Sequence, residues 1–193
     1  MPRPPAPASV ERIRQYVNTL DLETGHDELG TPADAGDWLA RHGLPGGDGA
    51  DQAWLVRLVA FRERLRTLLA ARSEDRVPDA AVLRDLATIA GDAPLVAEFC
   101  ADGTVAVRPA AGSDPRIAFL LADVIGAVGD GSWARLKVCA NDACRWAFWD
   151  GSRNHSGVWC AMAVCGNRAK GRAFRERSRI RPVRRPAKSR ADA

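Results

Sequence analysis

The sequence has few of the features that catalysis or membrane insertion requires. No apolar run is long enough to cross a bilayer, and the proline-rich N-terminal stretch lacks the apolar segment of a signal peptide. The three histidines, His26, His42 and His155, are scattered, and the chain contains no nucleophile motif and no glycine-rich phosphate loop. These absences predict a protein that is not an enzyme, has no membrane partner and lies in the reducing cytoplasm.

Cysteine is also scarce, but four of the five cysteines are regularly spaced. Two pairs, each with four residues between its members, are separated by fifteen residues: Cys139, Cys144, Cys160 and Cys165. Disulfides within the pairs would close two very short loops and leave Cys100 alone. Two close pairs instead offer four thiolates to a tetrahedral zinc ion, and a site filled by four sulfurs is closed to water. We therefore expect one structural Zn²⁺ on these four residues and a half-buried, unreactive Cys100.

The formal net charge is only +4, yet the charge is strongly segregated. Residues 166–193 contain 11 lysines and arginines against two acids, whereas residues 1–165 contain 17 basic and 22 acidic residues. An acidic body with a basic arm is typical of proteins that bind nucleic acid or an anionic surface.

Part of the basic arm has helical spacing. Arginines at steps of three or four residues share a helix face, which two further basic residues widen. The stripe consists of Arg168, Arg172, Arg175 and Arg179, widened by Lys170 and Arg177. We expect it to contact phosphates. For Arg168, and for Arg145 and Arg153, neutralising the charge of the zinc–thiolate centre is the alternative role.

Apolar periodicity and capping residues predict a helical body. Helices are expected at about 10–20, 32–42, 51–72, 79–90 and 115–128, and a hairpin at 95–99 and 104–108. On the fourth and fifth helices, the apolar stripes are expected to turn Leu83 and Val128 inward. On the third helix we expect the charges to form a solvated face: Arg57, Arg62, Glu63, Arg64 and Arg66.

The cysteine region predicts a small finger. Strands at 133–138 and 146–150 flank the first cysteine pair, and the second pair opens a helix that runs to about residue 177. The fold class is thus mainly α with a small β-hairpin (α+β), a helical N-terminal domain followed by a treble-clef-like four-cysteine zinc finger. The expected parts are a flexible lead-in (1–8), the helical domain (9–130), the finger with its helix (131–178) and a disordered basic tail (179–193).

Two motifs resemble known families. The cysteine pairs, with Ser152-Arg153-Asn154 between them and Cys165-Gly166-Asn167-Arg168 at the end, resemble the CGNR zinc finger. Upstream, Tyr16–Asp21 and Thr31–Asp34 resemble the start of the ABATE domain, which precedes this finger in bacterial proteins described as stress-associated transcription regulators. One departure is His155-Ser156-Gly157-Val158, where the family usually carries several basic residues.

The resemblance and the charge together imply a DNA-binding transcription regulator located at the nucleoid. The expected contacts to double-stranded DNA are Arg153, Asn154, Arg168, Lys170, Arg172, Arg175, Arg177 and Arg179. The helical domain would sense a small-molecule effector or form a homodimer. RNA binding and a zinc-stabilised protein-interaction module are the alternatives that the same features permit.

Overall fold

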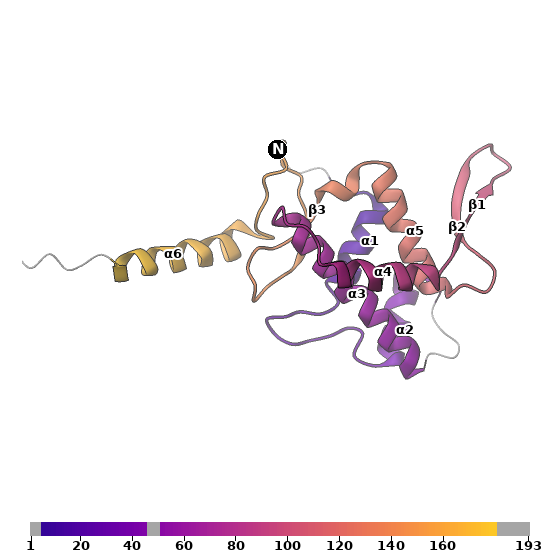
Figure 1. The fold of residues 1–193 in the computed structure, drawn as a ribbon, viewed down its shortest axis with the longest axis horizontal. Helices are drawn as coiled ribbons and strands as arrows, with labels where there is room; N and C mark the ends of the chain where they lie inside the picture. Colours follow the sequence, from indigo (N-terminus) through magenta and orange to yellow (C-terminus); the bar gives the residue numbers. More distant parts are fainter. Residues whose placement is uncertain (1–4, 46–50, 181–193) are drawn as a thin grey trace, which may run out of the picture. The chain divides into compact units, whose positions relative to one another are not determined.

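The computed structural model describes residues 5–45 and 51–180, and only the backbone of Arg179 and Ile180. The chain forms two compact units, one ending at Cys160 and one starting at Ala161 (Figure 1). Within the described residues, no helix is both long and apolar enough to span a membrane. The first unit contains α1 (Ala8–Val17), α2 (Pro32–Arg41), α3 (Gln52–Ser73), α4 (Ala80–Gly91), β1 (Leu95–Phe99), β2 (Val105–Pro109), α5 (Pro115–Gly129), a 3₁₀ helix (Ser132–Arg135), β3 (Leu136–Val138) and β4 (Ala147–Trp149).

The helices begin where the sequence places capping residues. The Thr31 side chain accepts a hydrogen bond from the Asp34 N–H at 3.2 Å, and Pro32 occupies the first position of α2. Asp51 caps α3 in the same way, accepting from the Trp54 N–H at 2.8 Å. The mainly α fold class with small hairpins is therefore confirmed, and each of the five helices forms within a few residues of its predicted range.

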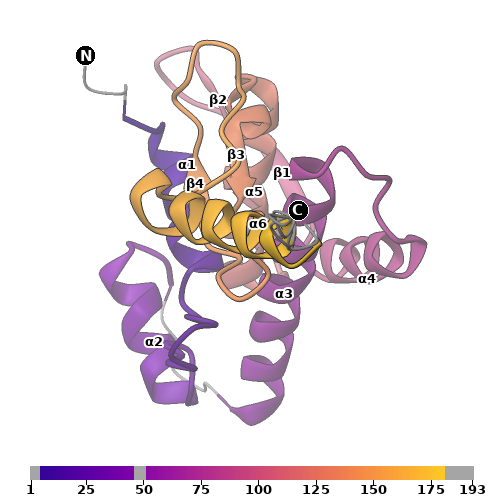
Figure 2. The same ribbon diagram turned by 90° about the vertical axis from the view of Figure 1, so that its left-hand side faces the viewer.

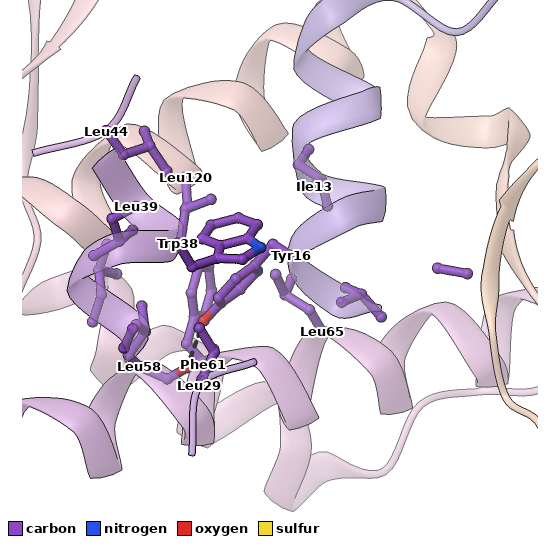
Figure 3. Packing of buried hydrophobic residues seen from close by; sticks show 14 of the residues in the cluster. Ile13, Tyr16, Leu29, Trp38, Leu39, Leu44, Leu58, Phe61, Leu65 and Leu120 are labelled. Atoms are coloured by element: carbon purple, nitrogen blue, oxygen red, sulfur yellow. Dashed lines mark hydrogen bonds between the residues drawn. The ribbon is translucent and has the colours of Figure 1, made fainter. Parts of the chain in front are cut away.

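The core of the first unit lies where α1, α2, α3 and α5 meet (Figure 3). Tyr16 of α1 is fully buried between Trp38 of α2 and Phe61 of α3, and its hydroxyl donates to the Leu58 carbonyl at 2.5 Å. The phenol thus buries a large ring while its one polar group has a partner. Strand β3 packs on α3 and strand β4 on α1, so the second hairpin belongs to this core (Figure 2).

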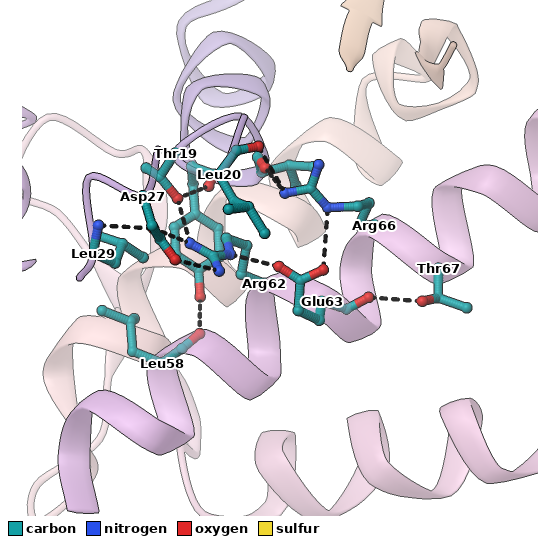
Figure 4. Close-up of polar contacts among 11 residues, drawn as sticks. Thr19, Leu20, Asp27, Leu29, Leu58, Arg62, Glu63, Arg66 and Thr67 are labelled. Carbon is teal, nitrogen blue, oxygen red and sulfur yellow. Dashed lines mark hydrogen bonds and ion pairs between the residues drawn. The ribbon is translucent and has the colours of Figure 1, made fainter. Parts of the chain in front are cut away.

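The expectation of a solvated charged face on α3 is wrong for Arg62 and Arg66, which are 1% and 5% exposed. The connection between α1 and α2 folds over α3 and covers them (Figure 4). Arg62 makes a bidentate pair with Asp27, at 2.6 and 2.9 Å, and also donates to Thr19. Arg66 donates to the Val17 carbonyl at 2.6 Å. These arginines fasten the connection to the core.

Three further expectations need correction. Residues 133–135 belong to the 3₁₀ helix, so the first strand of the finger begins only at Leu136, after Gly131 has turned the chain with φ 76°. Leu83 and Val128, expected to face inward, are 46% and 57% exposed because neighbours on the same helices make the core contacts instead.

One face of the β1–β2 hairpin is entirely apolar. Directly opposed residues share a face, and the pairs on this face are Leu95 with Pro109, Ala97 with Val107, and Phe99 with Val105. Phe99 is 82% exposed and Val105 is 57% exposed. The hairpin therefore presents uncovered apolar surface within the first unit.

The second unit starts with a π-helical turn, Met162–Gly166, and continues as α6, Asn167–Ile180. The predicted helix after the second cysteine pair is confirmed, although it extends beyond the expected end near residue 177. The expected disordered tail lies almost wholly outside the described residues, as do residues 1–4 of the lead-in. The proposed domain boundaries remain predictions.

Candidate metal centre and basic helix

The four spaced cysteines converge on one point. Their Sγ atoms all lie within 4.8 Å of one another, and those of Cys144 and Cys160 are 3.7 Å apart. Zinc–sulfur bonds of about 2.3 Å in a tetrahedron separate the sulfurs by about 3.8 Å, whereas a disulfide requires about 2.05 Å. All five cysteines lie in the described residues, and none forms a disulfide. The cluster fits one structural Zn²⁺, and Cys100 is half-buried as expected.

The first cysteine pair is held by the turn between β3 and β4. The Cys139 N–H donates to the Trp146 carbonyl at 2.9 Å, and the Cys144 N–H donates to the Asn141 carbonyl at 2.8 Å. Arg145 then adopts a left-handed backbone with φ 48°. This tight turn aims both thiolates to the same side of the hairpin end.

The helical body supports this turn through buried polar contacts. The Asn18 amide donates to the Ala147 carbonyl at 2.9 Å and accepts from the Ala147 N–H at 2.7 Å. Ser73 at the end of α3 accepts from the Val138 N–H at 2.9 Å. Because these contacts satisfy backbone groups of both strands, the metal-binding hairpin and the helices form one packed body.

A salt bridge joins the same turn to the end of α3. The Arg145 guanidinium lies 2.6 Å from the Glu74 carboxylate. Hydrogen bonds from Arg76 and from Arg145 lower the pKa of Glu74, so it stays ionised at neutral pH. Arg145 therefore has a carboxylate partner in the helical body, in addition to any electrostatic effect on the thiolates.

Asp150 organises the loop that follows β4. Its carboxylate, 2% exposed, accepts from the Lys137 ammonium at 2.8 Å, the Ser152 hydroxyl at 2.6 Å and the Gly157 N–H at 2.7 Å. Burial alone would raise the pKa of Asp150, but these hydrogen bonds outweigh burial and hold the pKa well below its usual range. A Cβ at Gly157 would lie 2.8 Å from this carboxyl group, so the loop requires glycine there.

The predicted nucleic-acid contacts fall in both units. Arg153 and Asn154 are exposed in the loop around Asp150, in the first unit. In the second unit, α6 exposes Arg168, Lys170, Arg172, Arg175 and Arg177. Arg168, Arg172 and Arg175 lie four and three residues apart, on one face of α6. The backbone of Arg179 continues this helix, while its side chain lies outside the described residues.

Sequence reasoning missed the residues that support the metal centre from a distance. Asn18 and Ala147 are 129 residues apart, and no short-range pattern links them. Ser152 belongs to the motif that resembles the CGNR finger, but the motif alone does not identify Lys137 and Gly157 as partners of the neighbouring Asp150.

Two family models match the chain. The CGNR zinc finger model matches residues 135–178, and the ABATE model, described as a putative stress-induced transcription regulator, matches residues 14–145. The two matches overlap at the first cysteine pair, the part of the finger that the helices hold. A search of curated proteins found no match.

Proposed function

Because the chain belongs to the ABATE family, described as putative stress-induced transcription regulators, and contains a CGNR zinc finger, we propose that it binds double-stranded DNA. The finger and α6 make the contacts, and the first unit carries the regulatory input. Such a protein works at the nucleoid of a bacterial cytoplasm. The zinc is structural, since the four sulfurs leave no position for a reacting water.

The composition and exposure of α6 carry this proposal. In 14 residues the helix has six basic residues and a single acid, Glu176. From Arg168 to Arg175 the exposed stripe extends about 10 Å along the helix axis. A helix of this kind fits the major groove, where guanidinium groups can reach phosphates and base edges.

The test is fluorescence anisotropy of the zinc-loaded protein with a random-sequence duplex at several salt concentrations. We expect the combined change of Arg172, Arg175 and Arg177 to alanine to weaken binding to every duplex. The log–log salt slope should fall by up to about 3, near 0.9 for each lost phosphate contact. The matched control removes three arginines of the first unit: Arg57, Arg84 and Arg108. Equal effects of the two variants would refute the assignment to α6.

The same titration with a structured RNA separates DNA from RNA binding. A duplex preference at equal salt supports the proposal, whereas tighter RNA binding replaces DNA with RNA as the target. Absence of binding to both at low salt would favour the protein-interaction module.

The first unit has two candidate roles in regulation, effector binding and homodimerisation. The uncharged apolar face of the β1–β2 hairpin supports dimerisation, because a surface without charge is complementary to a second copy of itself. Sedimentation velocity on the wild type and on Phe99→Ser tests this role. A monomer at all concentrations would leave effector binding as the role of the first unit.

A further inference from the structure

We infer that the first unit contains a binding site for a small, neutral, planar heteroaromatic molecule. The site is a cavity of about 170 Å³ between α1, α2 and the start of β4, lined by Arg14, Gln15, Asn18, Glu28, Trp38, His42 and Trp146. The ligand's role as an effector rests on the proposed function of the chain as a regulator.

The indole ring of Trp38 is part of the cavity wall. Trp38 is 1% exposed, and its ring stacks on His42 with centroids 3.9 Å apart and planes inclined by 19°. Figure 3 shows the ring nitrogen of Trp38 on the side toward Tyr16 of α1. An indole N–H is a hydrogen-bond donor, so a ligand with an acceptor atom beside this ring would suit it.

Two other lining groups are acceptors. The His42 Nδ1 lies 2.7 Å from the Trp38 carbonyl oxygen, and because a carbonyl only accepts, Nδ1 carries the proton. In the neutral ring Nε2 is then an acceptor. The Gln15 amide nitrogen donates to Glu11 at 2.8 Å, which identifies the other amide atom, Oε1, as a second acceptor. A ligand that carries a donor beside an acceptor, like the edge of an amide or amidine, matches this set.

The charges around the cavity cancel. Arg14 and Glu28 are its charged lining residues, and each already has a partner of opposite sign: Arg14 pairs with Glu11 at 2.5 Å, and Glu28 pairs with Arg41 at 3.3 Å. No excess charge is present to hold an anion or a cation, so the ligand is neutral.

The volume of the cavity and the side chains that line it further limit the class of ligand. Drug-sized ligands occupy cavities of roughly 300–1,000 Å³, so this one suits a molecule of one or two rings. The side chains of Trp38, His42 and Trp146 supply aromatic walls, which favour a flat ring. Nucleobases and nicotinamide have this combination of planarity, neutrality and amide-like edges.

The cavity adjoins the metal centre. Asn18 lines the cavity and also holds both backbone groups of Ala147. Trp146, another lining residue, accepts a hydrogen bond from the N–H of the zinc ligand Cys139 through its carbonyl. A ligand packed against Trp146 would restrain the turn that presents the first two thiolates. By linkage, any resulting change in DNA affinity has an equal reciprocal effect on ligand affinity.

The test is isothermal titration calorimetry of the zinc-loaded full chain with adenine, uracil and nicotinamide. We expect saturable one-to-one binding of at least one of these probes. Benzoate tests for an anion, and cyclohexanecarboxamide tests for a non-planar amide. No binding of the three planar probes, or equal affinity for benzoate, would overturn the inference.

Variants locate the binding. Gln15→Leu removes an acceptor at a half-buried position, and His42→Phe keeps a ring against Trp38 while removing Nε2. Each should weaken binding at least tenfold. The control, Asp37→Asn, lies in a neighbouring acidic hollow lined by His26, Asp27, Glu28, Asp34, Asp37 and Arg41, and should leave binding unchanged. Equal zinc content and equal unfolding temperatures confirm that the variants are folded. Unchanged affinity in Gln15→Leu and His42→Phe would place the probe elsewhere and overturn the site.

A second measurement separates this inference from the proposed function. The calorimetry contains no DNA, so failure of DNA binding leaves a positive result for the cavity intact. If the chain does bind DNA, the bound probe should change DNA affinity at least threefold in the wild type and leave it unchanged in Gln15→Leu. An unchanged affinity in the wild type would overturn the effector role.

Discussion

Asn18 illustrates how a single side chain can unite distant parts of a chain. Its amide satisfies the N–H and the carbonyl of Ala147, and all of these groups are buried. Arg62 acts similarly, since its pair with Asp27 fixes the connection between α1 and α2 against α3. At both positions the polar contact fixes the position of a backbone segment that apolar packing alone would not determine.

Replacing Asn18 with alanine should destabilise the protein markedly. The change leaves the Ala147 N–H and carbonyl buried without partners, at about 1–3 kcal/mol for each group. We expect the free energy of unfolding of the zinc-loaded protein, measured in urea, to fall by at least 2 kcal/mol on this basis. The exposed Asn154→Ala should change it by less than about 0.5 kcal/mol. Similar values for the two variants would contradict the buried contact.

The contribution of Asp27 to stability should depend on pH. Burial alone would raise the pKa of Asp27, but hydrogen bonds from Arg62 and the Leu29 N–H outweigh it and lower the pKa. A carboxyl group with a lowered folded pKa stabilises the fold fully above its unfolded pKa of about 3.9, and this contribution is lost as the pH falls through the folded value. Asp27→Asn should therefore destabilise the protein at pH 7.

Urea unfolding at pH 7 and at pH 3.5 checks this prediction. The difference between wild type and Asp27→Asn should narrow at the lower pH, where the wild-type carboxyl group loses its advantage. Exposed Asp37→Asn should show little difference at either pH. A difference for Asp27→Asn that stays constant would mean that Asp27 acts through shape and not through charge.

At the scale of helices and strands, the sequence predicted those features that depend on residues close together in the chain. Thr31 and Asp51 cap α2 and α3 as their positions suggest, and the turn at Asp102-Gly103 joins β1 to β2. Burial of Arg62 and Arg66 on α3 was not predictable, because their partners Asp27 and Val17 lie 35 and 49 residues earlier in the chain. The 3₁₀ helix before β3 was not predictable either, because apolar and polar residues alternate along Trp133–Val138 as they do in a strand.

Two glycine-to-alanine changes should have opposite effects. In α6, a Cβ on Gly171 would meet only the flexible end of Arg175, at 3.4 Å, so alanine should stabilise the helix by about 1 kcal/mol. Amide hydrogen exchange in residues 167–180 should slow about fivefold, the equivalent of that energy. Gly157→Ala should instead destabilise the loop, because its Cβ would clash with Asp150 at 2.8 Å. Faster exchange in Gly171→Ala would show that α6 requires glycine there.

At the scale of the whole chain, the hairpin that carries the first cysteine pair and the helical core share one packed body within the first unit. The sequence predicted the four zinc ligands because the members of each cysteine pair are close together in the chain. In the structure the four cysteines cluster as that spacing predicts. The sequence did not predict that β3 and β4 would be anchored to α3 and α1, since these contacts join residues up to 129 positions apart.

Zinc removal should therefore affect more than the finger. We expect a chelator to lower the unfolding temperature of the helical core by more than about 5 °C, as measured by calorimetry, because zinc stabilises a turn that Asn18 and Ser73 tie to the helices. Cys100→Ser should retain zinc and unfold at the wild-type temperature. A helical transition that is indifferent to the chelator would show that the hairpin and the helices unfold independently.

The position of the boundary between the two compact units limits how this protein can be recombined with others. A chimera joined near residue 130 would separate β3 and β4 from α1 and α3, leaving Ala147 and Val138 without their side-chain partners. Joining at Cys160 and Ala161, where the units divide, keeps those contacts intact. Exchange of target specificity between relatives is thus expected to succeed by transplanting the segment from Ala161 onward, with the last zinc ligand, and to fail by transplanting the whole finger.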